Sequence, residues 1–184
     1  FLAQLNSNNS HLANSFLRQR MYKQFIENLS WMGFFESLEG ILNYYYQHPL
    51  ISNSVLKFFL ELVTNRGNRI SLDSNSDMGT KLFKYIAKNV NAIGALLIKL
   101  ENDHRNLPPN ELYIRRYKPI ALIIQIATNT IASKLVNFSV MMNYKDQDSL
   151  EFFEVMFTLI YITPQEEVTA YIKVPLGFNM LITQ

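Results

Sequence analysis

The side chains that could perform chemistry are few and far apart in this sequence. The three histidines are His11, His48 and His104. None has a carboxylate or a second histidine four residues further on, the spacing by which a helix holds zinc. His48 precedes a proline, which favours a turn. The chain has no cysteine, so thiolate metal sites and disulfide bonds are excluded. We therefore expect no metal-binding residues.

Two acidic pairs are the remaining candidates for acid–base catalysis, Glu166-Glu167 and Asp146 with Asp148. Neither has a partner base or an apolar pocket in the surrounding sequence, so helix capping or solvated charge explains them better. The six glycines are spread singly, and none forms a phosphate-binding loop. We predict no catalytic and no cofactor-binding residues, and a protein that is not an enzyme.

Basic residues gather at three places, each with a structural and a functional explanation. The run from Asn65 to Arg69 closes an apolar stretch, and Gly67 with its flanking arginines is typical of a helix end, so we favour bracing for these arginines. A lysine stripe on the next helix is either a solvated face or one wall of a binding groove. The candidates for partner binding or for bracing between helix pairs are Asn65, Arg66, Arg69, Lys81, Lys84, Lys88, Arg115 and Arg116.

Composition indicates a folded protein without a polyelectrolyte partner. The chain has 184 residues, 48% of them hydrophobic, which is enough for one domain with a core. The formal net charge is +2, so neither direct nucleic-acid binding nor membrane-surface binding is expected. No apolar run is long enough to insert into a membrane. The chain begins without methionine and stops within an apolar pattern, so we expect a piece of a longer protein.

Hydrophobic spacing predicts about six helices and no strand. Ser15 and Ser30 are expected N-caps, and the residues before Ser15 are expected to be a frayed leader. Pro119 is expected to kink or restart its helix. The helix that runs to about Leu100 has an apolar line of Leu82, Phe83, Ile86, Val90, Ile93 and Leu97. Phe152, Phe153, Met156, Phe157 and Ile160 are expected to be buried. The expected helix pairs are 16–47, 51–100 and 111–162, with a further helix starting at about 174.

Residues 54–63 decide between two architectures. Only Lys57, Glu61 and Thr64 form a polar stripe, and apolar side chains occupy the rest of the circumference. A helix at the surface of a compact bundle would show a wider polar face. We therefore favour an all-α solenoid of HEAT-like antiparallel helix pairs, in which each pair is covered by the next, with residues 1–184 as a single segment of a larger superhelix.

Three stretches resemble one family of proteins. The run VLKFFLELVTNRGNRISLDSNSDMGTKLFKYIAKNV, residues 55–90, is similar to a helix end, an Asp- and Ser-rich loop and a following helix of the exportin-seven type of nuclear transport receptor. Residues 136–164 resemble the VNFGV…LYGDD segment of that family and the helix behind it. Residues 31–49 have its helix–proline–helix layout. The exportin-four type is a near neighbour.

The resemblance implies an internal-to-C-terminal piece of an importin-β-like receptor. Such receptors are superhelices of HEAT-type pairs that bind Ran carrying GTP, a protein cargo and Phe-Gly-rich nucleoporins. They shuttle between nucleus and cytoplasm, and Ran-GTP and cargo raise each other's affinity. Two alternatives remain open on the residues alone: a HEAT-like scaffold unrelated to nuclear transport, and a compact helical enzyme or ligand-binding bundle.

Overall fold

The computed structural model describes residues 2–45, 47–66, 69–70, 77–104 and 106–164, and the side chains from Asn14 onward except that of Asn43. Its regular elements are all helical: α1 Leu2–Trp31, α2 Phe34–Tyr45, α3 Pro49–Val63, α4 Asp77–Lys99, α5 Glu101–His104, α6 Pro109–Leu112, the π-helical turn η2 Tyr113–Tyr117, α7 Lys118–Ala132, α8 Phe138–Asn143 and α9 Gln147–Ile162. None of the helices in these ranges is long and apolar enough to cross a membrane.

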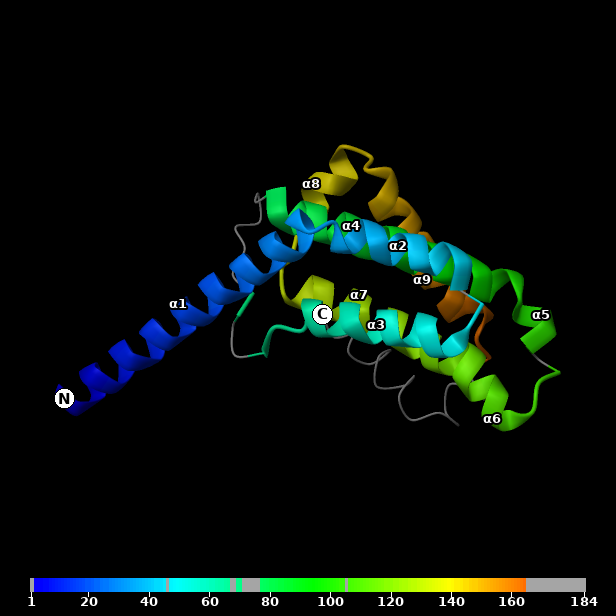
Figure 1. Ribbon diagram of the computed structural model, residues 1–184, viewed down its shortest axis with the longest axis horizontal. Coiled ribbons are helices and arrows are strands. Elements are labelled where there is room, and N and C mark those ends of the chain that lie inside the picture. The colour runs from blue at the N-terminus through cyan, green and yellow to red at the C-terminus, as the bar shows by residue number, and fades with distance from the viewer. Residues whose placement is uncertain (1, 46, 67–68, 71–76, 105, 165–184) are drawn as a thin grey trace.

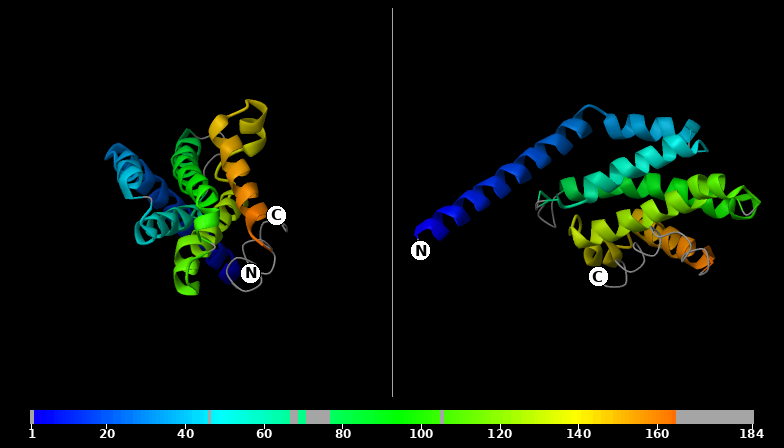
Figure 2. Two further views of the ribbon diagram at one scale, coloured as in Figure 1. Left: turned by 90° about the vertical axis from the view of Figure 1, so that its right-hand side faces the viewer. Right: turned by 90° about the horizontal axis from the view of Figure 1, so that it is seen from below.

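The long helices after α1 form two layers (Figure 1). α3 and α7 lie side by side in one layer, while α2, α4 and α9 follow one another across the other (Figure 2). The most extensive contacts join helices that are far apart in the sequence, α4 with α9 and α3 with α7. Since α3 and α4 run in opposite directions, as do α7 and α9, each antiparallel pair stacks on the next. The predicted all-α, HEAT-like solenoid is confirmed.

The N-terminal part differs from the expected helix pair at 16–47. α1 already includes the expected leader from its second residue on, and the expected caps Ser15 and Ser30 lie inside it. No glycine or proline interrupts the sequence before Gly33, so nothing stops the helix earlier. Gly33 has φ +64°, which a residue without Cβ adopts easily. α2 continues from that bend in the same general direction as α1 and does not turn back on it (Figures 1 and 2).

The enclosure of α3 agrees with its sequence. Leu56, Phe59 and Val63 have no exposed surface, whereas Lys57 and Glu61 face solvent. α7 covers α3 on one side, and α2, α4 and η2 contact it elsewhere. The expected role of Gly67 and the expected helix from about 174 fall outside the described residues.

The buried face of α4 is also the predicted one, but that of α9 is only partly so. On α9, Phe152 and Met156 are buried as expected. Phe157 is 58% exposed, so its predicted burial is wrong, and Leu159 is buried in the same helix. The apolar residues of α9 surround much of the helix, and the position of α4 selects which of them are covered. The predicted apolar line of α4 is buried at Leu82, Phe83, Ile86, Val90, Ile93 and Leu97.

Pro119 lies within a helical run and is accommodated by the π-helical turn η2. The N–H of Lys118 bonds to the carbonyl of Tyr113, five residues back. The same register would pair the Ile114 carbonyl with residue 119, but proline has no N–H. The side chain of Asn53 on α3 provides a replacement donor, with Nδ2 2.9 Å from the Ile114 oxygen. A buried amide therefore ties α3 to η2, the turn before α7.

The backbones of α4 and α9 approach each other closely at Gly94. A Cβ placed on Gly94 would lie 2.1 Å from Cγ1 of Val155 on α9. A Cβ on Gly40 of α2 would meet nothing within 4 Å. A side chain at position 94 would therefore clash with α9, whereas a side chain at position 40 of α2 would have open space around it.

Alanine substitutions at these glycines should change stability in opposite directions. We expect Gly94→Ala to destabilise the chain by about 1–3 kcal/mol, because the stiff Val155 side chain must move. Gly40→Ala should stabilise it by about 0.5–1 kcal/mol, because alanine loses less backbone entropy in a helix. Urea unfolding followed by circular dichroism measures both. Equal stabilisation by the two variants would contradict the close α4–α9 contact.

Candidate functional site

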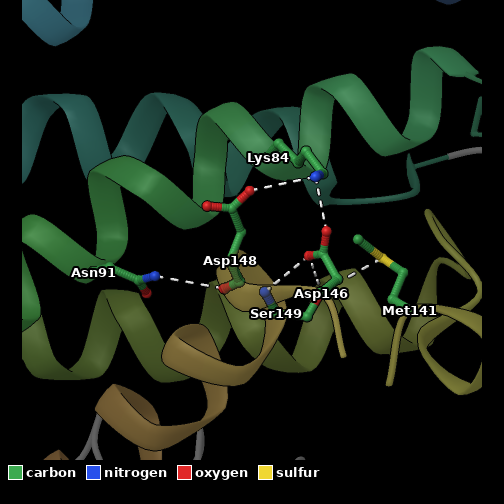
Figure 3. A network of polar contacts seen from close by, with 6 residues as sticks. All are labelled: Lys84, Asn91, Met141, Asp146, Asp148 and Ser149. Atoms are coloured by element: carbon green, nitrogen blue, oxygen red, sulfur yellow. Dashed lines mark hydrogen bonds and ion pairs between the residues drawn. The ribbon is translucent and has the colours of Figure 1, made fainter. Parts of the chain in front are cut away.

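Lysines on α4 reach carboxylates on both neighbouring helices of their layer. Lys84 Nζ lies 2.7 Å from Asp146 Oδ1 and 3.5 Å from Asp148 Oδ2, where α9 begins (Figure 3). Lys88 Nζ lies 2.6 Å from Glu39 Oε1 on α2. Lys84 and Lys88 therefore bridge three consecutive helices of one layer.

Asp146 combines this bridge with the capping of α9. Its carboxylate accepts hydrogen bonds from Ser149 N at 3.1 Å and from Ser149 Oγ at 2.9 Å. Partial burial acts to raise the pKa of Asp146, but the bonds from Lys84 and Ser149 outweigh it and leave this pKa lowered. The bond to Asp146 in turn raises the pKa of Lys84. The predicted helix cap is confirmed at Asp146, which is an acceptor for a fixed ammonium group and not a free acid or base.

A second contact joins α4 to α2 next to the Lys88 bridge. The Tyr85 hydroxyl donates to Glu36 Oε1, and this bond raises the pKa of Tyr85 and lowers that of Glu36. The Phe35 and Tyr85 rings stack with centroids 4.9 Å apart. Lys81, the third lysine of the predicted stripe, is exposed and forms no ion pair with a described residue. The stripe is therefore divided between bridging and solvated lysines.

Arg69 and Tyr22 fasten α1 to the end of α3. Arg69 Nε donates to the Thr64 carbonyl at 3.1 Å, and its Nη2 donates to the Glu61 carbonyl. The guanidinium lies over the Tyr22 ring, 5.5 Å from its centroid. The Tyr22 hydroxyl donates to the Leu62 carbonyl at 2.7 Å, and burial raises its pKa to about 12, so it stays protonated at neutral pH. Glu61 and Leu62 lie in the last turn of α3, where a helix leaves its carbonyls without partners, and the Thr64 carbonyl also accepts from the Arg66 N–H at 2.9 Å.

The other two residues of this candidate group have more local contacts. Asn65 closes the loop by pairing both ways with Ile70, since Oδ1 accepts from the Ile70 N–H at 2.8 Å and Nδ2 donates to its carbonyl at 3.2 Å. Arg66 pairs with Glu61 at 2.8 Å, and 68% of its side chain is exposed. From the sequence, Arg66 and Arg69 were expected to have the same bracing role. Among the described residues, Arg69 contacts another helix and Arg66 does not.

Arg116 is the most deeply buried of the candidates, with 2% of its surface exposed. Nη1 donates to the Glu101 carbonyl at 3.3 Å and Nη2 to the Ile162 carbonyl at 3.2 Å. Nη2 also lies 3.7 Å from the Glu101 carboxylate. One guanidinium therefore links η2, the residues after α4 and the end of α9. Its neighbour Arg115 is exposed and, among the described residues, pairs with Glu111 of the same helical run, at 3.3 Å.

His104 lies beside this buried guanidinium. The residue is 8% exposed, and Nδ1 has no hydrogen-bond partner among the described residues. Burial lowers the pKa of His104, and the charges of Arg116 and Arg115 lower it further. The imidazole is therefore held neutral, as a core histidine would be, and no group in the position of a catalytic acid or base faces it within the described part of the chain.

Several partners in these bridges carry no recognisable signal in the sequence. Glu36, Glu39 and Glu101 resemble any solvated helix acid, and Asn53 resembles any surface amide. Tyr22 lies at helical core spacing, which indicates its burial but not its hydroxyl contact. Within the described ranges no group of three or more histidine, aspartate or glutamate side chains could hold a metal. The arrangement consists of bridges between helices.

Arg69 and Arg66 form a matched pair for measuring a bridge. We expect Arg69→Ala to destabilise the chain by about 1–3 kcal/mol, because the Glu61 and Thr64 carbonyls lose a charged donor and the Tyr22 ring loses its cation. Arg66→Ala should cost less than about 0.5 kcal/mol, since its ion pair is exposed. Thermal unfolding of the two variants distinguishes them. A larger cost for Arg66→Ala would show that the α1–α3 junction is held differently.

Arg116 and Arg115 allow the same comparison at the other end of the helices. Arg116→Ala should cost about 3–5 kcal/mol, because the Glu101 and Ile162 carbonyls lose a charged donor and the removal of a large buried side chain leaves a cavity. Arg115→Ala should stay within about 0.5 kcal/mol. Denaturant unfolding gives both values. If the two costs were equal, the burial of Arg116 would be refuted.

Acidification should weaken the fold through His104. Because the folded-state pKa is lowered, the unfolded chain binds the proton more readily. The stability that neutral His104 contributes to the fold is present above about pH 6.5, which is its pKa in the unfolded chain. This stability is lost as the pH falls towards the lower pKa of the folded state. We expect the melting temperature to fall as the pH is lowered through about 6.5, and His104→Gln to flatten that dependence. A wild-type profile unchanged by His104→Gln would rule this origin out.

Comparison with known proteins gives relatives of one kind. The chain is 24% identical over 145 residues to Exportin-7-B of Xenopus laevis, covering 79% of this chain and 13% of that protein. It is 26% identical over 161 residues to Ran-binding protein 16 of Drosophila melanogaster, covering 88% and 14%. It is 27% identical over 155 residues to Exportin-7 of Dictyostelium discoideum, covering 84% and 15%.

The similarity extends over most of this chain but over a small part of each relative. The chain spans about one-seventh of the length of these curated relatives. No family model and no solved structure matches it. The predicted resemblance is confirmed: over most of its length, the chain is similar in sequence to the exportin-7 type of importin-β-related proteins.

Proposed function

We propose that the chain is a section of a Ran-GTP-dependent nuclear transport receptor of the exportin type, acting by protein–protein binding. The observation that supports this most is the similarity, over 79–88% of the chain, to proteins named exportin-7 and Ran-binding protein 16. The stacked antiparallel helix pairs agree with it, because an importin-β-like receptor is built from such pairs. Residues 1–184 would form one HEAT-repeat segment of that receptor, with no catalytic role.

The bridges suggest what this segment contributes. The pairs of Lys84 and Lys88 have partly exposed members, and pairs of that kind are worth about 0–1 kcal/mol each. The apolar α3–α7 and α4–α9 contacts keep neighbouring pairs together, while weak polar bridges can adjust to small rotations. Small changes add along a solenoid, since each pair contacts only its neighbours. A change of curvature at one binding site would then pass through the segment to a distant site. The coupling free energy between two such sites is typically about 1–3 kcal/mol.

The candidate residues divide into two proposed roles. Arg69, Lys84, Lys88 and Arg116 would brace neighbouring helices, since each contacts a second helix. Asn65 would shape the loop after α3. The exposed members, Arg66, Lys81 and Arg115, are those that a partner protein could reach.

Partners and location follow from the proposed receptor. Ran-GTP, protein cargo and Phe-Gly nucleoporins would bind the longer protein that contains this segment, which would shuttle between nucleus and cytoplasm. Direct nucleic-acid binding and membrane insertion are not part of the proposal. Cofactors are not needed for linked protein binding.

Nucleotide dependence tests the proposal. The natural-length protein containing this segment should bind Ran loaded with a non-hydrolysable GTP analogue at least tenfold more tightly than Ran loaded with GDP, measured by biolayer interferometry. Equal binding in both nucleotide states, or binding of another partner without Ran, would instead indicate a HEAT-like scaffold unrelated to transport. The double variant Lys84→Ala, Lys88→Ala should retain the fold. Its affinity for Ran should change less than the factor by which bound cargo raises that affinity.

A further inference from the structure

Helix α1 carries an apolar stripe that is open to solvent. Leu17, Met21 and Phe25 recur every four residues, so they lie on one face of the helix. Each of these side chains is 48–70% exposed. Tyr22 and Ile26 lie on another face of α1 and belong to the hydrophobic core. α1 itself extends away from the two layers (Figures 1 and 2), so the α1 stripe is accessible to a partner.

Positive charge without a partner borders the α1 stripe. Among the described side chains of α1, the charged ones are Arg18, Arg20, Lys23 and Glu27. Lys23 and Glu27 lie 4.0 Å apart and neutralise each other. Arg18 and Arg20 form no ion pair with a residue that the structure describes. At about 3.6 residues per turn, Arg18 lies on one side of the stripe and Arg20 on the other. The α1 stripe is thus apolar with basic margins.

The outer face of α9 carries the opposite charge. Leu150, Glu154, Phe157 and Tyr161 are exposed and lie on one face of the helix, because they are separated by three or four residues. Glu151 is exposed beside them. Neither glutamate forms an ion pair with a described residue, and α9 contains no basic residue. These five residues form the α9 stripe, in which apolar side chains alternate with uncompensated acidic ones.

The two stripes lie apart within one chain. α2, which follows α1, and α9 are at opposite edges of one layer, with α4 between them (Figure 2). Glu151 accepts a hydrogen bond from Gln147 Nε2 at 2.9 Å, but this neutral donor leaves its charge in place. The α1 stripe can therefore meet an α9 stripe only on a second copy of the chain.

Charge favours contact between unlike stripes over contact between like ones. Two α1 stripes would gather four arginines without a free acidic partner, and two α9 stripes would gather four glutamates. Like charges brought together at an interface oppose association. An α1 stripe against an α9 stripe instead covers apolar side chains of both helices and places Arg18 and Arg20 near Glu151 and Glu154.

We infer that the chain associates with itself head to tail, with the α1 stripe of one copy packed on the α9 stripe of the next. Such an interface is heterologous, so each added copy brings one free stripe and the assembly grows beyond a dimer unless it closes into a ring. This inference does not depend on the proposed transport function, because it rests on the exposure and the charge of the two stripes.

Sedimentation of the 184-residue chain tests the inference. Two helices in contact over a few turns bury less than a standard interface, so we expect weak association, measured over about 5–500 µM. The mean mass should rise with concentration and pass that of a dimer. Since the charged margins are exposed, raising the salt from about 0.05 to 0.5 M should weaken association at least fivefold.

Charge reversal localises the contact. The double variant Arg18→Glu, Arg20→Glu and the double variant Glu151→Lys, Glu154→Lys should each lower the affinity at least tenfold, because each brings like charges together. An equimolar mixture of the two variants should recover association, because each reversed stripe then meets an oppositely charged one.

A third variant controls for the change of net charge. Lys57→Glu with Lys99→Glu changes the net charge as much as the reversal on α1, but both lysines are exposed outside the two stripes. Its association should match that of the unmodified chain. Melting curves verify that all the variants fold.

Four results would overturn the inference. One is a monomer throughout the concentration range, and another is a mixture of the two reversed variants that stays monomeric. A third is a dimer that does not grow and responds to only one of the two reversals, because like stripes would then be paired. The fourth is association by the 184-residue chain but not by the natural-length protein, because flanking segments would then cover the stripes. Ran binding enters none of these measurements, so failure of the two proposals can be told apart.

Discussion

The structure depends on the burial of apolar helix faces against helices that are distant in the chain. α4 packs on α9, and α3 packs on α7, more extensively than either packs on its chain neighbour. A fully buried leucine or phenylalanine side chain contributes about 1.5–3 kcal/mol. Leu56, Phe59, Phe83 and Phe152 have no exposed surface, and all lie on these stacked helices. Pairs alone would leave such faces in water, so each pair requires the next one, which is why the molecule grows as an array.

Polar contacts then fix how the stacked helices lie relative to one another. Arg116 reaches two carbonyls, one after α4 and one at the end of α9, and Arg69 joins the end of α3 to Tyr22 on α1. Buried contacts such as those of Arg116 tolerate little change, because their groups cannot return to water. The partly exposed bridges of Lys84 and Lys88 cost little to break. The stack is therefore held mainly by its apolar contacts, and the partly exposed ion pairs add little to its stability.

The helical part of the fold could be predicted, and the contacts of the site could not. The apolar periodicity of residues 54–63 and of α4 was sufficient to predict their buried faces, because a helix presents residues three and four apart on one side. The N-caps at Ser15 and Ser30 were predicted incorrectly, since a serine is an N-cap only where a helix begins, and both lie inside α1. Burial of Phe157 was also predicted incorrectly, because several sides of α9 are apolar. The error at Phe157 could not be removed without knowing the neighbouring helix.

By itself the sequence determined the fold class, the absence of cysteine chemistry, the enclosure of α3 and the resemblance to exportin-7, because each depends on residue types and local spacing. Only the tertiary structure decided that Lys84 faces Asp146, that Arg69 and not Arg66 reaches another helix, and that Asn53 compensates for Pro119. These contacts join residues separated by many turns of chain. Their geometry follows from how whole helices stack, which no local pattern specifies.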